Sequence, residues 1–153
     1  MSKVVIPAEV EALATATANA ALAVHRALGP GLLESAYQEC LAIELSMAGV
    51  AVEREKVLPI VYRGRAIETA YRLDLIVGHK LLVELKAVES IAPVHQAQVV
   101  TYLKLLGLPL GLLINFNVPL IKDGIRRILN LDFQTDAPTS PLRQSLAPSR
   151  LRV

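Results

Sequence analysis

The stretch that decides the fold is residues 71–86, which read YRLDLIVGHKLLVELK. Two short apolar runs flank a tight glycine-containing turn, and this pattern predicts two adjacent strands. Asp74 lies in the first run, and Glu84 and Lys86 lie in the second. Charged side chains inside apolar strands are costly to bury unless they are paired or bind a metal. The three charges therefore suggest a metal-dependent phosphodiesterase site.

The length of the turn decides whether such a site can form. Directly opposed residues of a hairpin share one face of the sheet. A two-residue loop would place Asp74 opposite Val83 and send the carboxylates of Asp74 and Glu84 to opposite faces. A three-residue loop over residues 78–80 would place Asp74 opposite Glu84. The metal-site hypothesis therefore predicts an odd loop or a bulge at this turn.

Two helices are expected before the hairpin. The first begins near Pro7 and ends before Gly29, with apolar residues recurring every three or four positions. The second runs from about residue 32 to residue 48. Near its start, Glu34 allows two interpretations. It is either the N3 carboxylate of a capping box with Gly31 as N-cap, or a third carboxylate of the site.

The remaining elements surround the hairpin. Pro59 predicts that residues 51–62 form an exposed or edge strand, since proline cannot donate to a central ladder. A strand over residues 66–77 follows, and a helix over residues 94–106 presents a polar stripe. A buried strand is expected over residues 108–115, and residues 125–131 are a strand or a short helix. The polar stripe consists of His95, Gln98 and Tyr102.

Composition indicates a single globular domain over residues 1–133, followed by a mobile basic tail over residues 134–153. The chain is 53% hydrophobic, which suits a packed core. Its longest uncharged apolar run, residues 105–116, is shorter than the roughly 20 residues that span a bilayer. No signal-peptide core is seen at the start, and Cys40 is the one cysteine. We therefore expect a cytoplasmic protein without membrane association, in which Cys40 is a small core residue.

The charge of the body is balanced, with 13 basic and 13 acidic residues over residues 1–133. Nucleic-acid-binding proteins usually carry a basic excess. A second copy of the chain in a homodimer, a protein partner or the basic tail would then help to hold nucleic acid. Neutral charge and few aromatic residues also favour an alternative, in which the chain is a catalytically silent binding module or protein scaffold.

The charged residues have simpler explanations when each is taken alone. Glu84 and Lys86 are compatible with the solvated face of an amphipathic strand, and Asp74 with a structural ion pair. Taken together they suit phosphodiester chemistry. Two carboxylates on neighbouring strands suit Mg²⁺, and a lysine two residues later suits a scissile phosphate or its attacking water.

Several motifs in this order resemble one known family. The resemblance covers roughly residues 10–130, and its motifs are GLLESAY at 31–37, YRLD at 71–74, VELK at 83–86, PVHQAQ at 93–98, YL at 102–103, GLLINFN at 111–117 and KDGIRR at 122–127. Together they resemble the GxxExxY protein family, a branch of the PD-(D/E)XK nuclease superfamily. Leu73 stands where the superfamily name has proline, at a position that varies among its members.

The resemblance implies an α/β fold with a central mixed sheet flanked by helices. Our first hypothesis is a Mg²⁺- or Mn²⁺-dependent nuclease, with DNA favoured over RNA as substrate, acting in repair or defence, although the resemblance itself supplies no substrate. For this activity the resemblance implies the following roles. The metal ligands would be Asp74, Glu84 and the Leu85 carbonyl, with Glu34 in direct or water-mediated contact. Lys86 would be the catalytic lysine, assisted by Gln98 and Tyr102, and the expected substrate contacts are Tyr37 and His95.

Overall fold

The computed structural model describes residues 3–135, apart from the side chains of residues 68–70. The expected basic tail therefore lies outside the described residues, except for Gln134 and Thr135. The elements in chain order are α1 (Ala8–Leu28), α2 (Glu34–Met47), β1 (Val52–Tyr62), β2 (Arg65–Val77), β3 (Leu81–Lys86), α3 (Pro93–Leu106), β4 (Leu110–Asn115), the 3₁₀ turn η1 (Ile121–Gly124) and β5 (Ile125–Leu129). Residues 125–129 thus form a strand, one of the two possibilities left open by the sequence.

The strands form one five-stranded mixed sheet in the order β1-β2-β3-β4-β5. β3 and β4 are parallel, and the chain crosses between them through α3. All other neighbouring pairs are antiparallel. The prediction of an α/β fold with a mixed sheet flanked by helices is confirmed.

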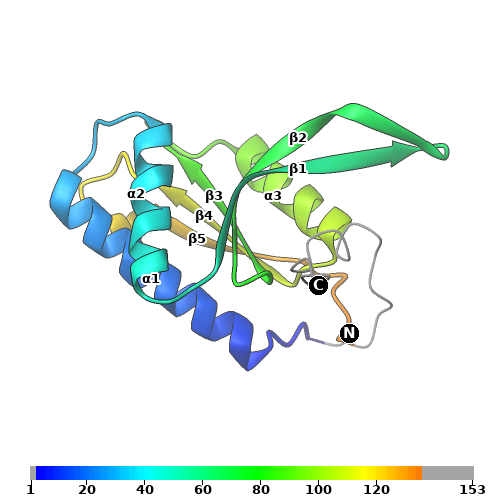
Figure 1. Ribbon diagram of the computed structural model, residues 1–153, viewed down its shortest axis with the longest axis horizontal. Coiled ribbons are helices and arrows are strands. Elements are labelled where there is room, and N and C mark those ends of the chain that lie inside the picture. The colour runs from blue at the N-terminus through cyan, green and yellow to red at the C-terminus, as the bar shows by residue number, and fades with distance from the viewer. Residues whose placement is uncertain (1–2, 136–153) are drawn as a thin grey trace, which may run out of the picture.

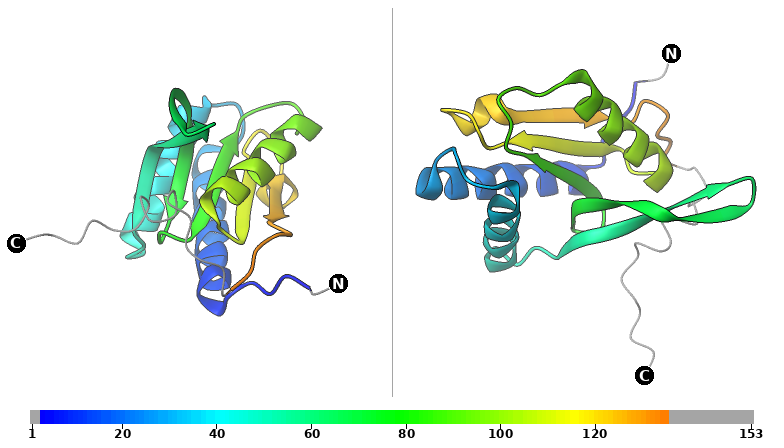
Figure 2. Two further views of the ribbon diagram at one scale, coloured as in Figure 1. Left: turned by 90° about the vertical axis from the view of Figure 1, so that its right-hand side faces the viewer. Right: turned by 90° about the horizontal axis from the view of Figure 1, so that it is seen from above.

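Helices cover both faces of this sheet (Figures 1 and 2). One core layer packs α1 and α2 against the sheet, with Tyr37, Leu41 and Leu45 of α2 fully buried. The other layer packs α3 against the opposite face through Val99 and Leu103. β3 and β4 are buried on both sides, which explains their nearly continuous apolar sequence.

The loop between β2 and β3 has three residues, and the predicted odd register is confirmed. Val77 pairs with Leu81, and the Lys80 N–H donates to the Val77 carbonyl at 3.1 Å. Gly78 has a φ of +57°, and a Cβ there would lie 2.5 Å from a methyl carbon of Leu13 in α1. The left-handed backbone therefore favours glycine, and a larger residue would also require the Leu13 side chain to shift.

β1 and β2 continue as a two-stranded ribbon that extends away from the rest of the sheet (Figures 1 and 2). β1 is an edge strand, as Pro59 predicted, and the register shifts between Leu58 and Ile60. We call residues 56–73 the hairpin arm. They are the part of β1 and β2, with their turn, that lies beyond Asp74, where β2 makes its outermost bonds to β3. Among the described residues, none of the helices is both long and apolar enough to cross a membrane.

Candidate active site

The site begins where β2 separates from β3. Their ladder covers three residue pairs, and the last pair before the strands diverge is Leu75 with Val83. Beyond it, side chains replace the missing backbone partners. The Asp74 N–H donates to Glu84 Oε1 at 3.2 Å, and the Leu85 N–H donates to Asp74 Oδ2 at 2.8 Å. The two carboxyl groups therefore meet in a fork between the strands, as the odd loop predicted.

The two acidic groups in the fork interact strongly. The Glu84 side chain is buried, and this burial raises the pKa of Glu84 to about 9. The charge of Asp74 and a hydrogen bond between the two carboxyl groups add to that increase in pKa. Without a cation, Glu84 therefore holds a proton at neutral pH. Such a strong perturbation within a cluster of acidic groups is typical of functional sites.

Strand alternation directs the groups that follow Glu84. Lys86 lies two residues further along β3 and shares its face, where its charge acts on Glu84. The Phe116 N–H donates to the Lys86 carbonyl at 3.0 Å, so this carbonyl faces β4. The Leu85 carbonyl faces the other edge of β3, on the same side as the N–H that bonds Asp74.

Glu34 approaches the fork from a different element. Burial raises the pKa of Glu34, the Asp74 charge raises it further, and Lys86 lowers it. The first residue of α2 therefore lies close enough to β2 and β3 to interact electrostatically with Asp74 and Lys86. The capping-box interpretation is wrong, because Leu33 is the N-cap and Glu34 is the first helical residue without a side-chain cap bond.

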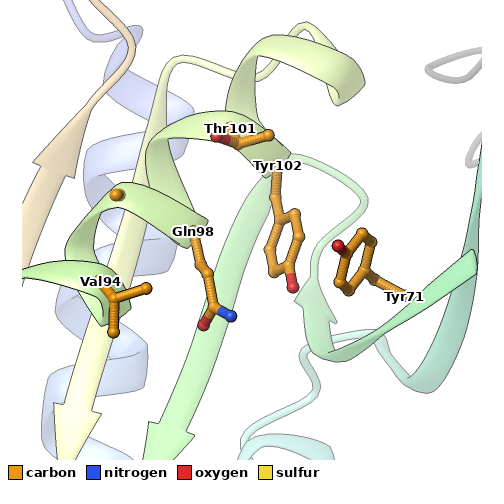
Figure 3. A pocket seen from close by; sticks show the side chains of 6 residues that line it. Tyr71, Val94, Gln98, Thr101 and Tyr102 are labelled. Atoms are coloured by element: carbon orange, nitrogen blue, oxygen red, sulfur yellow. The ribbon is translucent and has the colours of Figure 1, made fainter.

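Tyr102 of α3 lies near the fork, and Gln98 lies one turn before it on the same helix. Burial raises the pKa of Tyr102 to about 12, and the charges of Glu84, Tyr71 and Asp74 contribute to the increase. Tyr102 also contacts Tyr71 of β2, with ring centroids 5.5 Å apart. Gln98, Tyr102 and Tyr71 point toward a common groove beside the strands (Figure 3). Of the polar stripe predicted on this helix, Tyr102 thus lies near the acidic cluster and Gln98 lines the groove.

The family model described as the PD-(D/E)XK nuclease superfamily matches residues 11–128. The chain belongs to the PD-(D/E)XK nuclease superfamily. The narrower resemblance to the GxxExxY family rests on the motifs in the sequence. No curated protein and no solved structure matches the chain.

Nucleases of the PD-(D/E)XK superfamily generally use divalent metals, and hard divalent cations such as Mg²⁺ prefer oxygen ligands. Within residues 3–135, no three His, Cys, Asp or Glu side chains form a ready-made metal cage. Mg²⁺ needs less, because it keeps several waters and is commonly bound by one or two carboxylates. Asp74 and Glu84 supply two carboxylates on one face, and the Leu85 carbonyl supplies a third oxygen. The residues of the fork therefore fit a magnesium-type ion.

Tyr37, expected to contact substrate, has no exposed surface. Its hydroxyl donates to the Gly29 carbonyl at 2.6 Å and accepts the Leu32 N–H at 3.1 Å. Its ring stacks on Phe116 with the centroids 4.5 Å apart. A fully buried side chain cannot touch a substrate, so this expectation is corrected. Tyr37 instead holds the loop that leads into Glu34.

His95 lies in the first turn of α3 and is partly buried. Its Nδ1 atom accepts the Ala92 N–H at 3.0 Å, so the imidazole satisfies a backbone donor at the helix start. A contact between His95 and a substrate stays a prediction.

Sequence reasoning missed the structural role of Asn115 beside Lys86 in this PD-(D/E)XK domain. Asn115 ends β4 beside Lys86 and is buried. Its amide oxygen accepts the N–H groups of Val88 and Asn117, and its nitrogen donates to the Val88 carbonyl at 2.9 Å. These bonds fix the chain directly after Lys86. The signal in the sequence is an amide residue at the end of an apolar run, which alone indicates only the end of a strand.

Proposed function

We propose that the protein is a Mg²⁺- or Mn²⁺-dependent nuclease that hydrolyses phosphodiester bonds of DNA. The observation that carries this proposal is the meeting of Asp74 and Glu84 in the fork between β2 and β3. We assign these carboxylates and the Leu85 carbonyl as metal ligands. Glu34 would contact the metal directly or through a water, since it interacts electrostatically with Asp74.

The reaction forms one P–O bond to water and breaks one P–O ester bond. A bound divalent ion would supply Lewis-acid stabilisation and a more acidic water. Lys86 lies on the same face of β3 as Glu84. Its ammonium would orient the attacking water and offset the negative charge that builds up on the phosphate. Gln98 and Tyr102 would position the phosphate or the water from α3.

Although residues 1–133 are neutral as a whole, positive charge is concentrated in the hairpin arm. Residues 56–73 contain four basic residues and one acidic residue, so the remainder of the body is net acidic. Arg63 and Arg65 at the tip are exposed, and neither forms a salt bridge with a described residue. A two-stranded ribbon fits the major groove of DNA, and arginine binds phosphates well. Charge on the arm thus supports a nucleic-acid substrate.

The decisive experiment measures cleavage of single-stranded, duplex and branched DNA with Mg²⁺, with Mn²⁺ and with chelator. We expect cleavage with either metal and none with chelator. Asp74→Asn and Lys86→Met should each lower the rate at least about 100-fold, because both remove charge needed in the transition state. Lys104→Met is the matched control, since Lys104 is exposed and pairs with Asp132.

Two outcomes would contradict this mechanism. A rate that survives Lys86→Met unchanged would remove the lysine from the reaction. DNA binding without cleavage by the native protein, under every metal condition, would favour the alternative, a silent nuclease fold used as a nucleic-acid-binding or protein scaffold.

A further inference from the structure

A groove of about 200 Å³ lies between β2 and α3. It is lined by Tyr71, Val94, Ala97, Gln98, Thr101 and Tyr102 (Figure 3). This volume is below the roughly 300–1,000 Å³ that enclose a drug-sized ligand. The groove thus has room for a single planar group rather than for a whole nucleotide.

The groove has the chemistry of a site for a flat, uncharged group. None of its six lining residues is charged, so it does not suit a phosphate. The Tyr71 side chain is 51% exposed, which leaves much of its ring available for stacking. The ring planes of Tyr71 and Tyr102 are inclined at 47°, so the two tyrosines form a wedge. The amide of Gln98 offers both a donor and an acceptor to the edge of a ring.

Two of the residues that line the groove also lie near the proposed metal ligands. Tyr71 precedes Asp74 by three residues on the same strand. Tyr102 lies close enough to Glu84 for the two to interact electrostatically. A base stacked on Tyr71 in this groove would place a neighbouring phosphate of its strand near the fork.

We propose that this groove binds one unpaired nucleobase of the substrate strand, adjacent to the phosphate that is cleaved. The proposal rests on the proposed nuclease function and specifies its substrate. In intact duplex both faces of a base are stacked and its pairing edge is occupied, so entry would require unstacking. A single strand or a splayed end presents its bases without that cost. The protein therefore acts on single-stranded or frayed DNA in preference to fully paired duplex.

The test measures base binding separately from cleavage. The full chain is titrated, in chelator, into a single-stranded oligonucleotide that carries 2-aminopurine, whose fluorescence is quenched by stacking. We expect quenching with the native protein and with Tyr71→Phe, which keeps the ring. Tyr71→Ala should lose the quenching and bind the single strand about tenfold more weakly, since one base–aromatic stack is worth that order of affinity. Its affinity for a matched blunt duplex should not change.

Val57→Ala is the matched control, because Val57 is also exposed on the ribbon. Tyr71 pairs with Leu58 and shares its face, so the neighbouring Val57 points to the opposite face of the ribbon. Native affinity for Tyr71→Ala, or an equal loss on single strand and duplex, would overturn the proposal. Cleavage that is equally fast on blunt duplex and single strand would overturn it while leaving the nuclease function intact. Quenching that depends on Tyr71 in a protein that cleaves nothing would support the groove and reject the nuclease.

Discussion

The carboxyl group of Glu84 is buried and lies beside the carboxyl group of Asp74. Without a cation, burial and the Asp74 charge raise its pKa from 4.5 to about 9. A raised pKa means that the native state holds this proton more tightly than the unfolded chain does. The stabilising contribution of protonated Glu84 is thus fully present below about pH 4.5 and is lost as the pH rises through about 9.

This linkage gives a prediction for the metal-free protein. Between pH 6 and pH 8 its free energy of unfolding should fall by about 2 to 3 kcal/mol through this group, since the native state holds about one more proton than the unfolded chain and each pH unit then costs about 1.4 kcal/mol. Glu84→Gln should remove that loss, because the amide stays neutral. Denaturant unfolding in chelator at both pH values measures the effect. Glu39→Gln, at an exposed position of α2, should retain the native pH dependence. An equally steep fall in Glu84→Gln would rule out Glu84 as the origin.

At the scale of elements, the hairpin arm carries the exposed side chains of Arg63 and Arg65, which we propose as contacts to nucleic acid. Neutralising its tip in the double variant Arg63→Gln/Arg65→Gln should weaken duplex binding. The slope of log K against log salt should become shallower by roughly 1 to 2, since each lost phosphate contact removes about 0.9. Anisotropy titrations in chelator at several salt concentrations provide the measurement. Thermal stability should not change, because both side chains are exposed.

A double variant at Arg26 and Arg126 controls for the loss of two charges, since these exposed arginines lie on α1 and β5 rather than on the arm. If both double variants reduce the salt slope equally, binding is not localised to the arm.

The elements also show which features local sequence determines. The β2–β3 register could be predicted because a buried hairpin has few loop lengths, and only odd ones bring Asp74 and Glu84 to one face. The helix stripe on α3 followed from spacing alone. Tyr37 could not be assigned correctly, because its motif gives no indication that Phe116, distant in sequence, covers its ring. The Asn115 contact with Val88 was hidden for the same reason, since Asn115 ends β4 and Val88 lies in the loop after β3, 27 residues away in sequence.

Across the whole molecule, the fork lies near side chains from helices on both faces of the sheet. Glu34 comes from α2 on one face of the sheet, and Tyr102 comes from α3 on the other. Clustered acidic groups weaken such a junction when no cation is present. A divalent ion bound there would instead stabilise the native state, because the unfolded chain cannot assemble the ligands.

We therefore expect Mg²⁺ to raise the unfolding temperature of the native protein. At a concentration about ten times Kd, binding adds about 1.4 kcal/mol, or roughly 5 °C for a domain of this size. Asp74→Asn should abolish this response. In chelator it should be at least as stable as the native protein, because its amide oxygen can still accept the Leu85 N–H while one charge is gone. Asp123→Asn, at an exposed position in η1, should keep the full response. Differential scanning calorimetry at constant ionic strength separates specific binding from screening. A Mg²⁺ shift of equal size in Asp74→Asn would show that the ion acts elsewhere on the molecule.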